Sequence, residues 1–163
     1  MADSTEEDEQ LQALSKAFMM AMAARRAGDV DGAVEALRGI VRKEPRLPEP
    51  HYELGHIHLV AARLDEAELE ARTALKWLHQ GGQWVDDVPE HVMLALAHGL
   101  LGEVLRQKAA TDAVVFGDPE IFETLLDESK LNFAQAQELD PDSEHADHHS
   151  FFMELDGEDM PRA

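Results

Sequence analysis

The chain has 163 residues, enough for one folded domain with a buried core, and 44% of them are hydrophobic, which argues against general disorder. It carries 34 acidic and 14 basic residues, a formal net charge of −20, so phosphate backbones are repelled and no nucleic-acid partner is expected. The absence of cysteine excludes disulfides, zinc–thiolate sites, iron–sulfur clusters and cysteine nucleophiles.

The sequence carries no recognisable targeting segment. Its first nine residues are acidic, whereas a secretory signal begins with positive charge. The longest mostly apolar run, residues 91–102, is far shorter than the roughly 20 residues that a membrane span needs. We therefore expect a cytoplasmic protein with no membrane partner.

Helical periodicity dominates the chain from its beginning. An amphipathic helix is expected over residues 6–27, because Leu11, Leu14, Phe18 and Met22 recur at helical spacing. Glycine and proline separate this helix from those that follow. The next helix is expected to be capped by Asp29 or Asp31 and to end at Lys43 or Glu44, and two more helices are expected over residues 50–62 and 66–79. A later helix is expected to begin at Asp118-Pro119-Glu120, with proline in its first turn.

The sequence repeats after 34 residues. A shift of that length aligns eight positions in size or chemistry without a gap, as a helix–turn–helix repeat would. The aligned pairs are Met20 and Leu54, Ala21 and Gly55, Val30 and Leu64, Asp31 and Asp65, Ala33 and Ala67, Leu37 and Ala71, Ile40 and Ala74, and Val41 and Leu75.

These residues resemble the tetratricopeptide repeat (TPR) family. Its signature is a Leu-Gly pair in the first helix, small residues where the second helix crosses it, and a closing proline. The matching residues here are Leu54, Gly55, Ala33, Ala67, Ala74 and Pro45. A stretched third unit repeats the pair at Leu101-Gly102 and the crossing positions at Ser129, Phe133 and Ala136.

The resemblance implies an all-α solenoid of about three helical hairpins in a single domain over residues 1–157. Its expected parts are repeat 1 at about 14–47, repeat 2 at about 48–81, an expanded repeat 3 at about 90–142, a capping helix at about 144–156 and a tail at 158–163. Insertions at 82–89 and 110–118 contain Trp84 and the apolar stretch 113–116. These apolar groups either fold back against the repeats or reach out to a partner, and we expect them to fold back because an exposed tryptophan would favour aggregation.

The resemblance also implies a function. In this family the first helix of each repeat lines a groove that holds a segment of another protein, so we expect a non-catalytic adaptor or chaperone that needs no cofactor. The groove residues expected here are Phe18, Met22, Arg25, Arg26, Tyr52, His56, Leu59 and Arg106. Phe18 and Met22 are equally well explained as core residues beneath the next helix.

Charge asymmetry suggests an alternative function. Residues 11–47 hold 7 basic and 4 acidic residues, whereas residues 111–163 hold 2 basic and 15 acidic residues. Head-to-tail association of the chain into a scaffold would use this asymmetry. A solvated acidic surface that only maintains solubility explains the acidic end equally well.

Histidines are the remaining candidates for chemistry. His51, His58 and His98 occupy positions where the TPR pattern places large core residues, so we expect them to be packed and hydrogen-bonded. The group His145, His148 and His149 has the spacing of a zinc or nickel site or of a solvated helix face. We predict no metal site. We also predict no enzyme, since phosphate loops, nucleophile elbows and His-Glu-x-x-His motifs are absent from the sequence.

Overall fold

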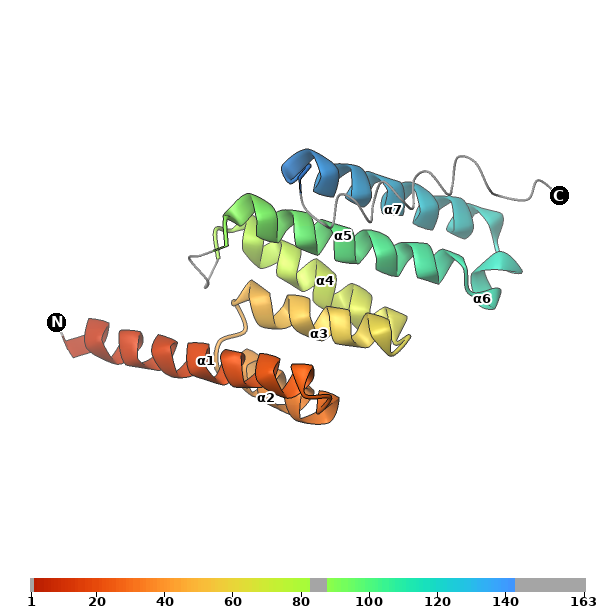
Figure 1. The fold of residues 1–163 in the computed structure, drawn as a ribbon. Helices are drawn as coiled ribbons and strands as arrows, with labels where there is room; N and C mark the ends of the chain where they lie inside the picture. Colours follow the sequence, from red (N-terminus) through yellow and green to blue (C-terminus); the bar gives the residue numbers. More distant parts are fainter. Residues whose placement is uncertain (1, 83–87, 143–163) are drawn as a thin grey trace. The chain divides into compact units, whose positions relative to one another are not determined.

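The structure is a computed structural model that describes residues 2–82 and 88–142. Helices make up 83% of these residues and no strand occurs among them, which confirms the all-α prediction (Figure 1). The chain divides into two compact units, Met1–Val85 and Asp86–Ala163, and the boundary falls between the second and third expected repeats. Within the described ranges, no helix is long and apolar enough to cross a membrane.

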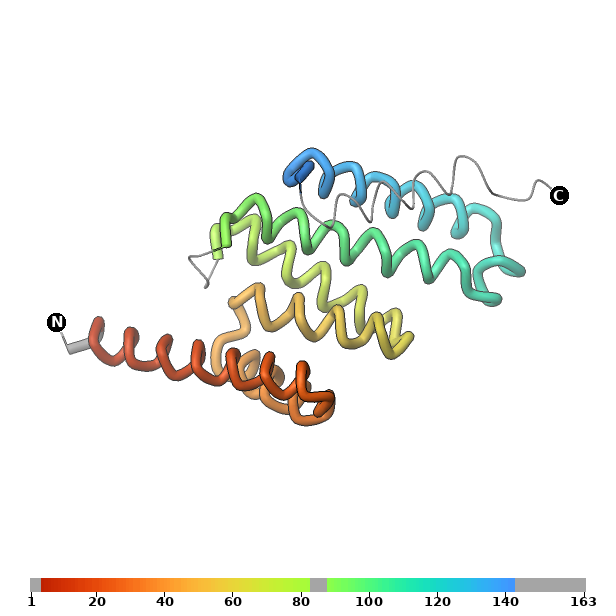
Figure 2. Tube along the Cα trace, in the orientation of Figure 1, coloured from red at the N-terminus to blue at the C-terminus, as the bar shows by residue number. Residues whose placement is uncertain are grey.

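Two helical hairpins form the first unit (Figure 2). They consist of α1 (Ala2–Arg26), α2 (Val30–Lys43), α3 (Pro48–Val60) and α4 (Leu64–His79). Helices α1 and α2 pack together, α3 packs with α4, and α2 packs with α3. Since α2 and α4 begin 34 residues apart, the sequence repeat corresponds to one hairpin. Helix α1 begins at residue 2 rather than 6, and residues 4–13 are exposed.

The two hairpin turns share one backbone arrangement. Gly28 and Ala62 occupy equivalent positions and both have positive φ, at 88° and 59°. In each turn the following amide donates to the carbonyl oxygen five residues earlier over 2.9 Å, as in a Schellman helix end. Ala62 therefore adopts a left-handed conformation that costs an L-residue about 1–2 kcal/mol and that glycine adopts freely.

We predict that Ala62→Gly raises the free energy of unfolding by about 0.5–1 kcal/mol, because relief of this conformation exceeds the added entropy of the unfolded chain. Gly28→Ala should lower it by about 1 kcal/mol. Urea denaturation followed by circular dichroism measures both. Ala61→Gly is the matched control, since Ala61 has a φ of −83° and should lose stability. A loss for Ala62→Gly equal to that control would contradict the prediction.

The second unit is a longer hairpin of α5 (Glu90–Ala109) and α7 (Pro119–Leu139), connected through the short α6 (Asp112–Val115). Asp118 caps α7 by accepting a hydrogen bond from the Glu120 amide, and Pro119 occupies its first turn, as expected. Helix α6 packs against both α5 and α7.

Part of the extra length of the expected third repeat is helical. Helix α7 begins ten residues before Ser129, whereas α4 begins three residues before the equivalent Ala67, so α7 is longer by about two turns. Within residues 110–118, Phe116 is 84% exposed, so the prediction that this stretch folds back is wrong for its aromatic residue. Trp84 and the capping helix expected at 144–156 lie outside the described residues.

The two long helices of the second hairpin, α5 and α7, approach each other closely at Gly102. A Cβ atom on Gly102 would lie 3.0 Å from the Phe133 ring, whose residue is only 7% exposed. Beside it, the Ser129 hydroxyl donates to the Gly102 carbonyl oxygen over 2.7 Å. The residues that were matched from sequence as the crossing point of this hairpin are therefore in contact.

Gly102→Ala should lower the free energy of unfolding by about 1–2 kcal/mol, because the buried Phe133 ring has little room to move. Gly39→Ala is the matched control in α2, where the added Cβ would meet only Arg42 Nη2 at 3.8 Å and helix propensity should add about 0.5–1 kcal/mol. Thermal or urea unfolding measures both variants. Equal stabilisation of the two would show that the contact with Phe133 is not tight.

Candidate functional site

A polar cluster connects the first helices of the two hairpins in the first unit. Arg25 of α1 forms an ion pair with Glu53 of α3 and donates a further hydrogen bond to His56 Nδ1. The side chains of Arg25 and Glu53 are 27% and 19% exposed. This partly buried pair therefore fixes the position of Arg25 against α3 and requires His56 to be unprotonated at Nδ1.

Burial shifts the ionisation of the groups around this pair. Burial and the nearby Glu53 charge raise the pKa of Tyr52 to about 12, so its phenol remains neutral. Burial also raises the pKa of Glu53, and the Arg25 charge opposes that shift. The Tyr52 and His56 ring centroids lie 6.4 Å apart, with the rings tilted by 40°. Two aromatic rings and an arginine thus form one fixed arrangement.

We call Arg25, Arg26, Tyr52, His56 and Leu59 the α1–α3 surface. Arg26 is exposed, whereas the other four side chains are half-buried. On α3 the spacing of four and three residues places the last three members on one face. These five of the eight residues expected in a groove thus belong to two helices of the same unit.

Phe18 and Met22 serve the core of the first unit. Both are half-buried and pack against a buried cluster formed by α1, α2 and α3. The members of this cluster are Ala21, Ala33, Leu37, Leu54 and Ile57. A charged substitution at either residue would therefore disturb folding as well as any surface.

Arg106, the eighth expected groove residue, belongs to the second unit. Its guanidinium donates two hydrogen bonds to the Glu103 carboxylate, at 2.8 and 2.7 Å, and Gln107 donates a third to the same group at 2.9 Å. All three residues lie on α5. Arg106 is therefore held on its own helix by a bidentate ion pair.

The expectation of packed, hydrogen-bonded histidines is confirmed. His51 and His58 are 6% and 4% exposed, and half-buried His98 contacts Asn132 Oδ1 through Nδ1 at 2.9 Å. Sequence reasoning missed the acidic partners Glu53 and Glu70, because nothing in the local pattern distinguishes them from the many other carboxylates. Interhelical geometry alone identifies them.

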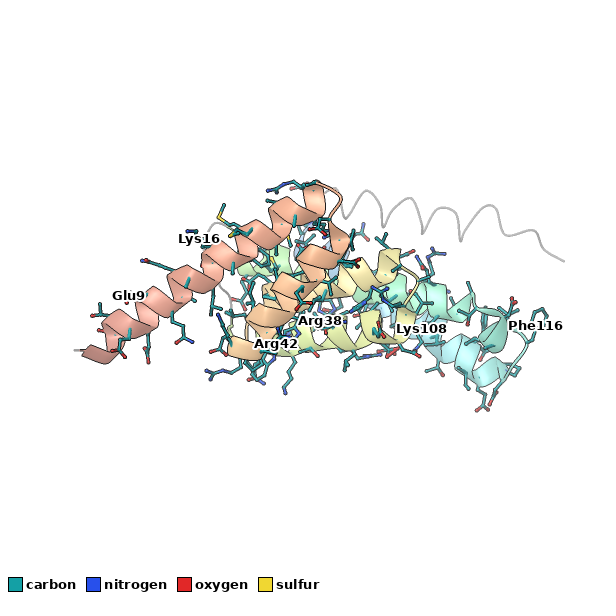
Figure 3. All side chains as sticks on the ribbon, turned by 90° about the horizontal axis from the view of Figure 1, so that it is seen from below. Glu9, Lys16, Arg38, Arg42, Lys108 and Phe116 are labelled. Carbon is teal, nitrogen blue, oxygen red and sulfur yellow. The ribbon has the colours of Figure 1, made fainter. Side chains whose placement is uncertain are left out.

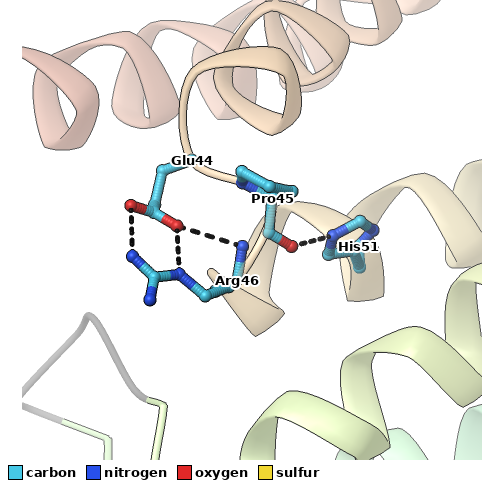
Figure 4. Close-up of polar contacts among 4 residues, drawn as sticks. All are labelled: Glu44, Pro45, Arg46 and His51. Atoms are coloured by element: carbon cyan, nitrogen blue, oxygen red, sulfur yellow. Dashed lines mark hydrogen bonds and ion pairs between the residues drawn. The ribbon is translucent and has the colours of Figure 1, made fainter.

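His51 stabilises the segment that connects α2 and α3 (Figure 4). Its Nε2 lies 2.7 Å from the Pro45 carbonyl oxygen, and its Nδ1 lies 2.6 Å from Glu70 Oε2 on α4. Because both partners are acceptors, the doubly protonated imidazolium satisfies both. Burial lowers the pKa of His51, but the Glu70 carboxylate and the Pro45 carbonyl outweigh burial and raise it overall.

His58 has the opposite preference. Its Nδ1 accepts a hydrogen bond from Arg63 Nε at 3.0 Å, which requires an unprotonated nitrogen. Glu66 Oε2 lies further from the same nitrogen, at 3.3 Å, and would favour its protonation. Burial is the largest cause of the lowered pKa of His58. The Arg63 and Arg38 charges lower this pKa further, whereas the Glu66 and Glu70 charges raise it. The two buried histidines of α3 therefore respond to pH with opposite signs.

We predict that the two histidines make opposite contributions to the pH dependence of stability. The raised pKa of His51 means that its contribution is full below about pH 6.5 and is lost as pH rises through the folded-state pKa. The lowered pKa of His58 means that its contribution is full above about pH 6.5 and is lost as pH falls.

The measurement is urea denaturation of the wild type, His51→Gln and His58→Gln between pH 5 and 8. The stability advantage of the wild type over His51→Gln should shrink as pH rises, and its advantage over His58→Gln should grow. Parallel curves for the two variants would contradict the opposite protonation states assigned here.

Two apolar hollows share no lining residue with the α1–α3 surface. One, of about 230 Å³, lies between α1 and α2 beside Leu14, Met20 and Ile40. The other, of about 400 Å³, lies where α5, α6 and α7 meet. Its lining consists of Arg106, Ala109, Ala110, Val115, Phe122, Leu126 and Lys130.

Within residues 2–82 and 88–142, no group of three or more histidine and acidic side chains is arranged to hold a metal ion. His145, His148 and His149 lie outside the residues that the structure describes. Comparison of the sequence with known proteins finds no matching family model and no matching curated protein.

Proposed function

We propose that the protein is a cytoplasmic, non-catalytic interaction module whose first unit holds a segment of a partner protein on the α1–α3 surface. The hairpins α1–α2 and α3–α4 are TPR-like repeats in this proposal, and α5–α7 is an expanded third repeat. The 34-residue spacing of α2 and α4 and the matching turns at Gly28 and Ala62 support the repeat assignment.

The observation that carries the proposal is the fixed position of Arg25 against α3. Its ion pair with Glu53 and its hydrogen bond to His56 hold a guanidinium and two rings in place before any partner arrives. Side chains that are already ordered lose little entropy on binding, which favours affinity. Tyrosine and arginine are also the residues that contribute most often to protein interfaces.

The chemistry of the surface indicates the kind of segment that it would hold. Leu59 and the Tyr52 ring offer apolar area, and exposed Arg26 offers charge-assisted hydrogen bonds at its edge. A segment with an apolar side chain next to a carboxylate or a free carbonyl complements these groups. No bond-making step and no cofactor is part of this proposal.

Self-association is the second candidate, favoured by one observation on charge. Lys16, Arg38 and Arg42 are exposed on α1 and α2 (Figure 3). The exposed acidic residues of the second unit include Asp118, Glu120, Glu123 and Asp127. Pairing between copies through these groups would weaken with salt, because screening at physiological ionic strength acts within about 8–10 Å.

The test compares two double variants of the full chain. Arg26→Glu with Leu59→Gln alters the α1–α3 surface, whereas Arg72→Glu with Leu69→Gln makes the same changes at exposed positions on α4. Each protein is used to capture partners from a lysate of its own cells. We expect the first variant to lose captured partner by at least about tenfold and the control to retain it.

Circular dichroism establishes that both variants remain helical. Equal capture by both variants would exclude the α1–α3 surface as the binding site. Capture of the chain alone, together with association that sedimentation shows to weaken between low and high salt, would favour the self-assembling scaffold instead.

A further inference from the structure

The second unit concentrates its positive charge at one place. Residues 88–142 contain 11 acidic residues and only three basic ones, Arg106, Lys108 and Lys130. Two of these three, Arg106 on α5 and Lys130 on α7, line the hollow where α5, α6 and α7 meet. Two of the three cations of this described part of the unit thus line its apolar hollow.

The interior of the hollow is apolar. Ala109, Val115, Phe122 and Leu126 form its walls, and its volume of about 400 Å³ lies within the range of about 300–1,000 Å³ that is typical of ligand pockets. Val115 is 50% exposed there, although it is a large hydrophobic residue. Such a hollow accepts an aromatic or aliphatic side chain.

The two cations at the rim of the hollow favour a ligand that carries negative charge. Glu103 holds Arg106 by a bidentate ion pair, which fixes the position of the guanidinium and compensates part of its charge. Lys130 is exposed and contributes a mobile ammonium group from the other helix. The matching occupant is a peptide segment that carries an apolar anchor followed by carboxylates.

The chain itself contains such a segment. Its sequence reads Phe-Phe-Met-Glu at 151–154 and continues with acidic residues at 156, 158 and 159. These are the only aromatic residues after α7. The segment belongs to the second unit and lies outside the residues that the structure describes.

The segment can reach the hollow. Lys130 and Phe122 lie 9 and 17 residues before the end of α7 at Leu139, which corresponds to about 14 and 26 Å along the helix. Phe151 follows Leu139 by 12 positions in the sequence, and an extended chain of that length spans at most about 40–43 Å. Binding within the same chain also avoids the entropy cost of bringing two molecules together.

We propose that the hollow between α5, α6 and α7 is a binding site for acidic peptide segments with aromatic anchors, and that the chain's own segment 151–159 occupies it. Phe151 or Phe152 fills the apolar interior, and the acidic residues that follow it lie against Lys130 and Arg106. An external segment of the same chemistry would have to displace it. This proposal concerns the second unit and does not depend on the α1–α3 surface.

Disulfide trapping tests the proposal, because the chain has no cysteine of its own. The test pair is Val115→Cys with Phe152→Cys. The control pair is Leu131→Cys with Phe152→Cys, since Leu131 is 62% exposed and lies on the opposite face of α7 from Phe122. Leu131 is also nearer to the end of α7 than the hollow is, so tethering alone favours the control pair.

Both full-length double variants are oxidised at low micromolar concentration, and their products are followed by mass and by non-reducing gels. We expect the 115–152 disulfide to form within one chain at least about tenfold faster than the 131–152 disulfide. Equal rates, or a faster control, would overturn the proposal. Faster trapping between two chains would also overturn it, because a second copy would then be the occupant.

A charge variant separates recognition from chance proximity. Lys130→Glu should slow the 115–152 reaction by about fivefold, the effect of about 1 kcal/mol, and Lys130→Arg should restore it. Neither change should alter the 131–152 rate. A 115–152 rate that is unaffected by Lys130→Glu would overturn the role of the cationic rim. Circular dichroism verifies that the variants are folded.

Discussion

Both units depend on the close approach of paired helices. Small side chains at the helix contacts make this approach possible. Helix α4 buries Ala67, Ala71 and Ala74 completely where it packs with α3, and Gly102 of α5 leaves room for the Phe133 ring of α7. Helices that carry large residues at such positions would be held further apart. The interhelical hydrogen bonds of His51 and Ser129, at 2.6 and 2.7 Å, would then be out of reach.

Buried polar groups add a second requirement, that of matched partners. His51 is surrounded by two acceptors and His58 accepts from an arginine, so one helix carries two buried histidines with opposite preferences. A buried polar group without a hydrogen-bond partner would cost about 1–3 kcal/mol, so each of these groups requires its particular partner. The same principle places Arg25 between Glu53 and His56, and it gives the α1–α3 surface its fixed shape.

Local pattern predicted most of the helices and the repeat. The spacing of apolar residues, the glycine at Gly28 and the prolines at Pro45 and Pro119 act within a few residues, so they can be interpreted without tertiary information. The start of α1 was not predicted. Residues 2–10 are polar on several sides, and a helix of this kind lacks the apolar period that reveals it.

The sequence predicted less of the candidate site than of the fold, because several contacts of the site depend on how the helices pack. Tyr52, His56 and Leu59 share a face of α3 by helical spacing alone, so their grouping followed from the sequence. The ion pair of Arg25 with Glu53 and the core positions of Phe18 and Met22 did not, because both depend on how α1 lies against its neighbours. The full exposure of Phe116 likewise depends on the direction of the short α6.

By itself the sequence determined the helical class, the 34-residue hairpin period and the small residues at which helices cross, since these follow from chain geometry and side-chain size. Only the tertiary structure decided which carboxylates meet which cations, and which of two buried histidines has its pKa raised and which has it lowered. It also decided that two of the three cations among residues 88–142 line one apolar hollow. Charge interactions act between residues that are far apart in sequence, so their outcome depends on distances that no local pattern contains.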